Sequence, residues 1–293
     1  MKPIRSGKVR DVYECGENFV IVSSDRISAF DCILPTPIPD KGKILNTLSV
    51  FWFARTGHII DNHLLLHRSS DFPAPFNAMP ELEGRSSLVR RADVIPIECV
   101  VRGYLAGSGW KDYQKNQTVS GIRLPPNLRE SEQLAEPIWT PSTKAESGHD
   151  EPIDFETAAQ ICGRARAEQL RDVSLALYNF AANYARERGI IIADTKFEFG
   201  LFGDELILID EMCTPDSSRF WNMETYAAGR AQDSYDKQFV RDYLETLAWD
   251  KTPPAPALPP QIIQRTRDKY IEAFNRLTGN VWPDTDVRPE KYA

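Results

Sequence analysis

The sequence predicts an α+β protein, in which a strand-rich first third precedes a long helix and a strand hairpin. Three observations predict this class. Short apolar runs separated by turn residues fill the first third, and apolar residues recur at helical spacing within 155–188. Two further apolar runs, at 190–200 and 205–210, flank a Gly-Asp pair that is typical of a tight turn.

Size and composition limit the possible functions. A chain of 293 residues can form one large domain or two smaller lobes. Its net charge of −7 lacks the basic surplus of a general nucleic-acid binder, although clustered arginines could still hold an anionic small molecule. With no signal peptide, no long apolar run and five cysteines without CxxC spacing, we expect a soluble cytoplasmic protein with buried, reduced thiols.

In the N-terminal half, strands are expected at 19–23 and 93–102. A helix is expected between them at 45–60, where apolar residues recur at helical spacing. The segment 69–84 contains three prolines and is expected to be a loop.

In the second half, 114–152 is rich in Pro, Ser, Thr and Gly and is expected to be an irregular excursion that serves as a binding or lid element. One helix is expected over 155–188, with Gly189 as its stop. A proline-rich linker then leads to a last helix at 261–278, which the pattern assigns to packing.

The hairpin carries the strongest chemical signal. Strand periodicity places Asp194, Lys196 and Glu198 on one face, and Asp210 ends the partner strand. A turn near Gly203 sets Asp210 opposite 196–198. Asp210 shares the face of Glu198 only if the loop has an odd number of residues or contains a bulge. Two carboxylates and a lysine suit Mg²⁺ carrying a nucleoside triphosphate, while the alternative is a surface hairpin with cross-strand ion pairs.

Two further segments could bind anions. The segment 213–221 combines hydroxyl side chains with Arg219, although it could also be an ordinary Pro-Asp turn. In 102–110, Arg102 and Ser108 could grip a phosphate or carboxylate, and three glycines would let the backbone approach a ligand. The alternative for 102–110 is a tight turn that leads into a helix.

Weaker signals lie elsewhere. The segment 6–13 could cover a triphosphate, but it is not a P-loop, and the protein-kinase motifs are missing. Lys144 could reach a phosphate from its loop, and His149 could be a base or an exposed turn residue. Three histidines could suggest a metal site, but the stretch around them lacks acidic partners, which argues against one: His58, His63 and His67.

Taken together, these segments resemble the SAICAR synthetase family, the ligases of purine biosynthesis. The resemblance runs along nearly the whole chain in the family's order, and two long signatures carry it: 95–108 and 193–200. Shorter segments at 7–13, 24–31 and 40–43 agree with it. The blocks at 140–146 and 210–219 resemble the longer, yeast-like branch.

The resemblance implies a kinase-like N-terminal lobe of antiparallel strands at 1–101 and a larger ATP-grasp-like α+β lobe at 102–293, with a nucleotide cleft between them. It also implies the reaction. L-Aspartate is joined to 5-amino-1-(5-phosphoribosyl)imidazole-4-carboxylate through an acyl phosphate, with ATP and Mg²⁺. A small-molecule kinase and a non-catalytic nucleotide sensor are the alternatives.

The resemblance also implies residue roles. It assigns ATP to Gly7, Lys8, Arg10, Glu98, Val100 and Lys144, and the metal to Glu198 and Asp210. It assigns the ribonucleotide to Arg102, Ser108, Asp194, Arg219, Lys237 and Arg241, and catalysis to Asp194, Lys196 and Arg219. The groups that bind L-aspartate and the oligomeric state are left without a prediction.

Overall fold

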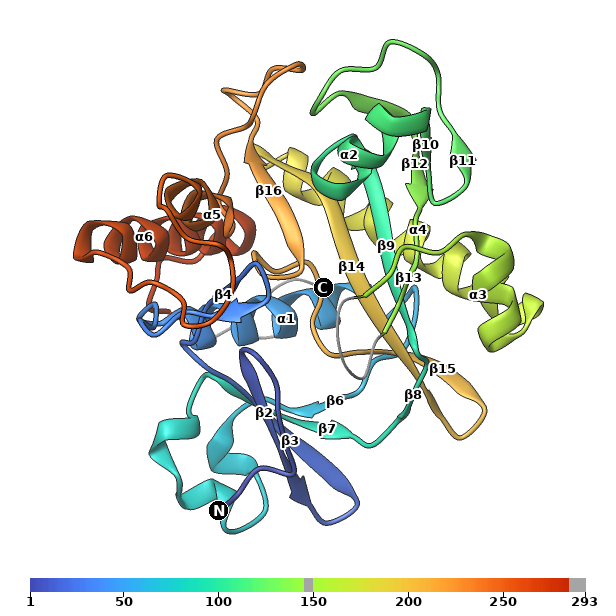
Figure 1. Ribbon diagram of the computed structural model, residues 1–293. Helices are drawn as coiled ribbons and strands as arrows, with labels where there is room; N and C mark the ends of the chain where they lie inside the picture. Colours follow the sequence, from blue (N-terminus) through green and yellow to red (C-terminus); the bar gives the residue numbers. More distant parts are fainter. Residues whose placement is uncertain (145–149, 285–293) are drawn as a thin grey trace.

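The architecture is described by a computed structural model covering residues 1–144 and 150–284 (Figure 1). Its first sheet has five antiparallel strands in the order β1-β2-β3-β7-β6. Helix α1 (Lys41–Thr56) packs against β3 and β7 of this sheet. The strands are β1 (Arg5–Ser6), β2 (Arg10–Cys15), β3 (Asn18–Ser23), β6 (Leu64–Leu66) and β7 (Ser86–Arg90).

The second sheet is larger and is built around β14 (Ile190–Phe202), the longest strand described. Its main path is β12-β9-β14-β15, with β13 added to β9, and β8 and β16 added to β14. These strands are β8 (Asp93–Val94), β9 (Ile97–Tyr104), β12 (Gln133–Trp139), β13 (Ser142–Thr143), β15 (Glu205–Ile209) and β16 (Ser218–Asn222). The α+β class is therefore confirmed.

Helices and short elements complete the fold. Helix α4 (Arg164–Arg186) packs on β14 and β9, and α6 (Pro260–Thr278) packs on α1 and α5 (Gln238–Glu245), as the red and blue ribbons in Figure 1 show. No helix within the described ranges is long and apolar enough to cross a membrane. The remaining elements are α2 (Gly107–Asn116), α3 (Phe155–Cys162), η1 (Ser69–Asp71), η2 (Phe76–Ala78), η3 (Pro80–Leu82), β4 (Ser28–Ala29), β5 (Cys32–Ile33), β10 (Thr118–Val119) and β11 (Ile122–Arg123).

Several expected elements differ from the structure. The single helix expected over 155–188 is wrong, because Gly163, with φ of 86°, separates α3 from α4. The segment 114–152 is not an irregular excursion throughout, since β12 pairs with β9 despite its proline and polar residues. The first helix begins at Lys41 rather than at 45, and the strand expected at 93–102 is interrupted between β8 and β9.

The hairpin and the last helix agree with the sequence. Strands β14 and β15 pair around Gly203, and α6 ends at Gly279, which has a left-handed φ of 73°. The expected boundary between residues 101 and 102 falls within β9, while all five strands of the first sheet precede it. The division into lobes at that boundary stays a prediction.

Candidate active site

One face of β14 carries the charged residues that the alternation predicts. Strand β9 pairs with β14 so that Arg102 lies opposite Asp194 and Val100 lies opposite Lys196. The Lys196 ammonium donates to Glu98 at 2.6 Å and to Glu198 at 2.8 Å. The opposite face supplies Phe197 and Phe199, both fully buried, to the core. The prediction of one charged and one apolar face is therefore confirmed.

Electrostatics keep this face charged. Burial opposes the charged form of Lys196, but Glu198 and Glu98 outweigh it and hold the pKa of the ammonium above its usual range. Burial raises the pKa of Glu98, and the neighbouring Lys196 opposes that rise. At neutral pH Lys196 is therefore a fixed cation between two carboxyl groups.

Asp210 reaches the site by a route that differs from the prediction. The hairpin loop is neither odd nor bulged. Phe202 pairs with Glu205 across a two-residue turn, and Glu198 pairs with Ile209 in regular register. Asp210 leaves the strand in a left-handed conformation, with φ of 67°. The predicted loop geometry was therefore wrong: the loop is regular, and Asp210 instead turns out of the strand through its own backbone and accepts a hydrogen bond from Arg10.

Cations from distant segments surround the Glu198–Asp210 pair. Arg10 of β2 donates to Asp210 and forms a second ion pair with Glu211, and Lys144 donates to Glu198. Burial would raise the pKa of Asp210, but Arg10, followed by Lys196, holds it well below its usual range. The structure thus brings together four residues that the sequence assigned separately to ATP and to the metal.

The N-terminal loop is held in place by Arg26. The backbone N–H of Gly7 donates to the carbonyl of Arg10 at 2.7 Å, which closes a tight turn. Arg26 donates to the carbonyl oxygens of Gly7 and Lys8 and to both carboxylate oxygens of Asp11. The exposed Lys8 pairs with Asp31. The loop is therefore fixed to the protein, with Arg10 at Asp210 and Lys8 at Asp31.

The donor set suits Mg²⁺, which prefers carboxylate oxygens and usually keeps phosphates and water as its other ligands. Within 1–144 and 150–284, no three His, Cys, Asp or Glu side chains are grouped to hold a metal by themselves. His63 is buried beside Phe53, and burial lowers its pKa to about 4, while His149 lies outside the described residues.

A second polar cluster forms around Asp194, on the same strand face. Arg102 donates to Asp194, to the Ser108 hydroxyl and to the Thr140 hydroxyl, each at 3.0 Å. Arg219 of β16 also donates to Asp194, which is only 4% exposed. Arg102 is thereby committed to three partners of the protein and positions Asp194 and Ser108.

A cavity of about 360 Å³ opens next to this cluster. Ser108, Arg219 and Arg241, three of the predicted substrate residues, line it together with Trp110 and Trp221. Two guanidinium groups and a hydroxyl can bind a phosphate or a carboxylate, and the tryptophans offer apolar surface to a ring. The cavity therefore fits an anionic molecule that carries a flat ring.

Lys237 does not line this cavity. The structure places its ammonium 3.8 Å from Asp216, a carboxylate that also accepts a hydrogen bond from Lys41 at 2.7 Å. Burial lowers the pKa of Lys237, and Arg241 lies among the charges that act on it. Its predicted contact with the substrate stays a prediction.

The glycines of 102–110 make room for the protein's own arginines, which differs from the expected approach to a ligand. A Cβ on Gly107 would overlap the guanidinium of Arg219, and one on Gly109 would lie 3.1 Å from Cδ of Arg102. Gly107 also has φ of 56°, a conformation that disfavours other residues. Small residues here are thus needed for the two arginines to converge.

We expect Gly107→Ala to lower kcat/KM by about tenfold and to destabilise the fold by ~1–3 kcal/mol, because the methyl group displaces Arg219. Gly16→Ala is the matched control, since Gly16 has a similar φ of 62° with no neighbour within 4 Å of its added Cβ. Initial rates and thermal unfolding of both variants check this. Equal activity of the two variants would show that Gly107 is not needed to make room for Arg219.

Asp236 gives the region a pH dependence. It is 2% exposed and accepts hydrogen bonds from the backbone N–H groups of Phe220 and Gln238. Burial raises its pKa to about 6, against the opposing effect of these N–H groups and Arg219. A raised folded-state pKa stabilises the fold below the unfolded-state value, and that contribution is lost as pH rises through 6.

We therefore expect the free energy of unfolding of the wild type, relative to Asp236→Asn, to fall by about 2 kcal/mol between pH 4 and pH 7. Denaturant titrations of both proteins across this range measure the difference. A difference that stays constant or grows with pH would show that Asp236 does not titrate in this way.

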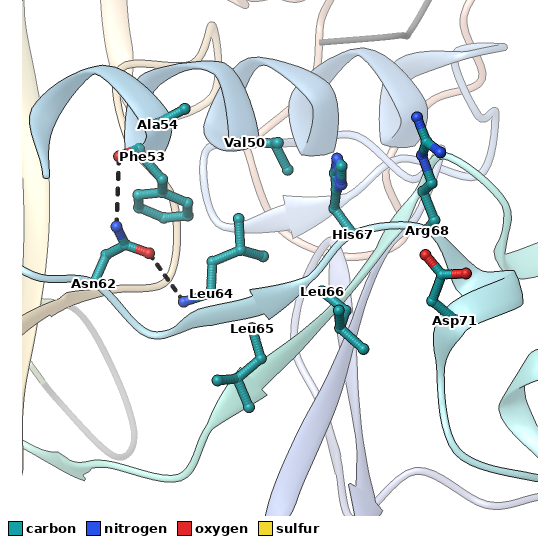
Figure 2. A pocket seen from close by; sticks show the side chains of 10 residues that line it. All are labelled: Val50, Phe53, Ala54, Asn62, Leu64, Leu65, Leu66, His67, Arg68 and Asp71. Carbon is teal, nitrogen blue, oxygen red and sulfur yellow. Dashed lines mark hydrogen bonds between the residues drawn. The ribbon is translucent and has the colours of Figure 1, made fainter. Parts of the chain in front are cut away.

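A larger cavity, of about 630 Å³, lies between α1 and β6 (Figure 2). Asn62 closes one end, where its amide donates to the carbonyl of Phe53 and its oxygen accepts from the N–H of Leu64. None of the predicted ATP, substrate or metal residues lines this cavity. Phe53 lines both this cavity and the small pocket of Arg10 and Asp210, so the cavity adjoins the candidate site without containing its predicted residues.

Sequence reasoning missed several residues of the site. Arg26 and Glu211 each bind a residue assigned to ATP, and Asp216 accepts a hydrogen bond from Lys41 and forms a longer ion pair with Lys237 at 3.8 Å. All three lie in segments that the family resemblance already included, at 24–31 and 210–219. A charged residue within a long shared motif was the available signal, but its partner could not be identified without the fold.

The two clusters place arginines, lysines and carboxylates on one face of β14, an arrangement that suits an enzyme with anionic small-molecule substrates. The SAICAR synthetase family model matches residues 3–256. A phosphoribosylaminoimidazole-succinocarboxamide synthase from Thermodesulfovibrio yellowstonii is 55% identical over 95% of this chain and 96% of its own length. One from Geobacter sulfurreducens is 55% identical over 93% of each chain.

Solved structures indicate the same family. SAICAR synthase from Saccharomyces cerevisiae, complexed with SAICAR, aligns with a TM-score of 0.87 and 43% identity over 97% of this chain and 96% of its own. The chain belongs to the SAICAR synthetase family. It is an ATP-dependent carbon–nitrogen ligase of purine biosynthesis. The identity expected from the sequence is confirmed.

Proposed function

We propose that ATP binds with Mg²⁺ among Arg10, Lys144, Glu198 and Asp210, and that the imidazole ribonucleotide occupies the cavity of Arg219 and Arg241. One observation carries this proposal: both clusters lie on the same face of β14. Asp194 contacts the arginine pair, and Glu198, four residues further along, contacts Lys144 and Lys196. Four residues of strand span about 13 Å, which leaves room for the two ligands to lie next to each other along the strand.

Ligand binding requires an exchange of counter-ions. Without ligands, Arg10 and Lys144 neutralise Asp210 and Glu198. The ATP phosphates offer these two cations new partners, while Glu198 and Asp210 would hold Mg²⁺. When bound, Mg²⁺ offsets negative charge on the phosphates. Lys196 stays between Glu98 and Glu198, close to where charge grows during phosphoryl transfer.

The chemistry follows from the leaving group. A free carboxylate is a poor acyl donor, because oxide would have to leave. Transfer of the terminal phosphoryl group of ATP to the imidazole carboxylate gives ADP and an acyl phosphate. The amine of L-aspartate then attacks the acyl carbon, phosphate leaves, and an amide forms with the loss of a proton, giving SAICAR. No covalent bond to the enzyme is needed.

The protein contributes charge and position. Arg102 and Arg219 fix Asp194, so the ribonucleotide meets a preorganised set of donors. Holding three substrates together can remove an entropic barrier of ~7–11 kcal/mol at best. Arg219 and Lys196 stabilise the negative charge that develops on the two sides of the reacting carboxylate.

Product analysis tests this function. Mass spectrometry of a reaction with ATP, Mg²⁺, L-aspartate and the imidazole carboxylate nucleotide should show SAICAR, and ADP release should require both acceptor substrates. ADP released without aspartate would favour a small-molecule kinase. ATP binding without any ADP release would favour a nucleotide sensor.

Two broader statements accompany the proposal. We infer that the enzyme works in the cytoplasm, because all five cysteines are free thiols and four of them are buried. We also propose that residues 1–101 form a lobe that covers ATP and that 102–293 form the catalytic lobe. The ion pair of Arg10 with Asp210 joins the two sheets at the proposed nucleotide site.

A further inference from the structure

Asp216 lies at a buried junction of four segments. Its carboxylate is 2% exposed and accepts hydrogen bonds from Lys41 of α1 at 2.7 Å and from the Tyr270 hydroxyl of α6 at 3.1 Å. Lys237, at the start of α5, lies 3.8 Å from the same carboxylate. The acidic segment that follows β15 is therefore tied to α1, α5 and α6 through one side chain.

Helix α6 makes a second contact next to this junction. Arg267 donates to the Asp40 carboxylate from Nε at 2.8 Å and from Nη2 at 2.6 Å. Asp40 has a left-handed φ of 66° and directly precedes Lys41. The family match ends at residue 256, before α6 begins. Helix α6, which the sequence assigned to packing, thus contacts both Asp216 and Asp40, the residue next to Lys41.

The two oxygens of Asp216 have different neighbours. Oδ2 accepts from Lys41, and Oδ1 accepts from Tyr270. Lys237 also faces Oδ1, but 3.8 Å is longer than a hydrogen bond. In the described part of the chain, this 3.8 Å ion pair is the contact of the Lys237 ammonium with a carboxylate, and the charge of Arg241 also acts on it. The ion pair is therefore long, and the ammonium can exchange Asp216 for another anion.

We propose that α6 is a positioning element of the active site. The Tyr270 hydroxyl occupies Oδ1 of Asp216 and thereby keeps the Lys237 ion pair with Asp216 long, so that the ammonium can turn from beside the cavity to the phosphate of a ribonucleotide bound at Arg241. The inference rests on the proposed function. Without the hydroxyl, Lys237 moves onto Asp216 and its charge is lost to the substrate.

The first test is Tyr270→Phe in the full-length enzyme. Phenylalanine keeps the buried ring and removes only the hydroxyl. We expect KM for the ribonucleotide to rise about tenfold, with kcat and KM for ATP close to those of the wild type. Tyr184→Phe is the matched control, because the Tyr184 hydroxyl also donates to α6, at the carbonyl of Leu277, 3.1 Å away.

If Tyr270→Phe and Tyr184→Phe show the same kinetics and the same loss of melting temperature, α6 acts through packing alone and the proposal is overturned. An equal rise in KM for all three substrates would overturn it too, because it would indicate a general distortion. The proposed function is tested separately, by whether the wild-type enzyme forms SAICAR.

A double-mutant cycle tests the route through Lys237. Lys237→Met should raise KM for the ribonucleotide, and adding Tyr270→Phe to it should raise KM no further. If Tyr270→Phe still raises KM about tenfold when Lys237 is already absent, the hydroxyl acts by another path and the assignment to Lys237 is wrong.

Discussion

Glu198→Gln should lower kcat by about 10²–10³-fold at saturating ATP and Mg²⁺, the range expected when a group that stabilises a transition-state charge is lost. The Glu198 side chain is 8% exposed and lies between Lys144 and Lys196. Glutamine keeps the shape but removes the charge that would hold Mg²⁺. Steady-state rates over a range of Mg²⁺ concentrations measure the loss.

The control is Glu205→Gln, an exposed carboxylate at the start of β15 in the same hairpin. It should leave the rate within about twofold of the wild type, as surface substitutions usually do. A melting temperature for each variant separates lost chemistry from lost folding. A Glu198→Gln enzyme with a near-normal rate at saturating Mg²⁺-ATP would exclude Glu198 as a metal ligand.

Asp194→Asn should affect both folding and substrate binding. Asp194 accepts hydrogen bonds from Arg102 and Arg219 while it is almost fully buried. Removal of its charge leaves two guanidinium groups without their shared anion, which we expect to cost ~3–5 kcal/mol of stability. Displacement of Arg219 should lower kcat/KM for the ribonucleotide about 100-fold.

Asp61→Asn provides the comparison, since Asp61 pairs with Arg90 at 2.7 Å on the surface, with 59% of its side chain exposed. Such pairs contribute at most ~1 kcal/mol. Denaturant unfolding and kinetics with the ribonucleotide as the varied substrate distinguish the two sites. A loss in Asp194→Asn no larger than that in Asp61→Asn would show that the arginine pair does not depend on Asp194.

The two variants also separate the two halves of the proposed site. Loss of Glu198 should act through Mg²⁺-ATP, whereas loss of Asp194 should act through the ribonucleotide. We expect this difference because the two ligands are proposed to bind at opposite ends of one face of β14. If both variants change the same kinetic constant for the same substrate, the proposed arrangement along β14 is wrong.

Much of the strand chemistry could be predicted from the sequence. Alternation along β14 was enough to place Asp194, Lys196 and Glu198 on one face, because strand periodicity is a local property. The long motifs at 95–108 and 193–200 were enough to indicate the family. The single helix expected over 155–188 failed for a local reason too, since Gly163 permits a break that apolar spacing does not report.

The acidic pair shows where prediction from sequence ended. Register arguments required an odd or bulged loop to bring Asp210 to Glu198, but the loop is regular and the backbone of Asp210 turns instead. The residues next to Asp210 in the sequence do not indicate that its backbone is left-handed. This conformation is stabilised by contacts such as the ion pair with Arg10, 200 residues away in the chain.

By itself, the sequence determined the α+β class, the charged face of β14 and the family. Tertiary structure alone decided the conformation of Asp210, the commitment of Arg102 to three protein partners and the attachment of α6 to Asp216. The physical reason is the same in each case. Periodicity and motifs describe neighbours along the chain, whereas ion pairing and burial depend on which distant segments meet and exclude water.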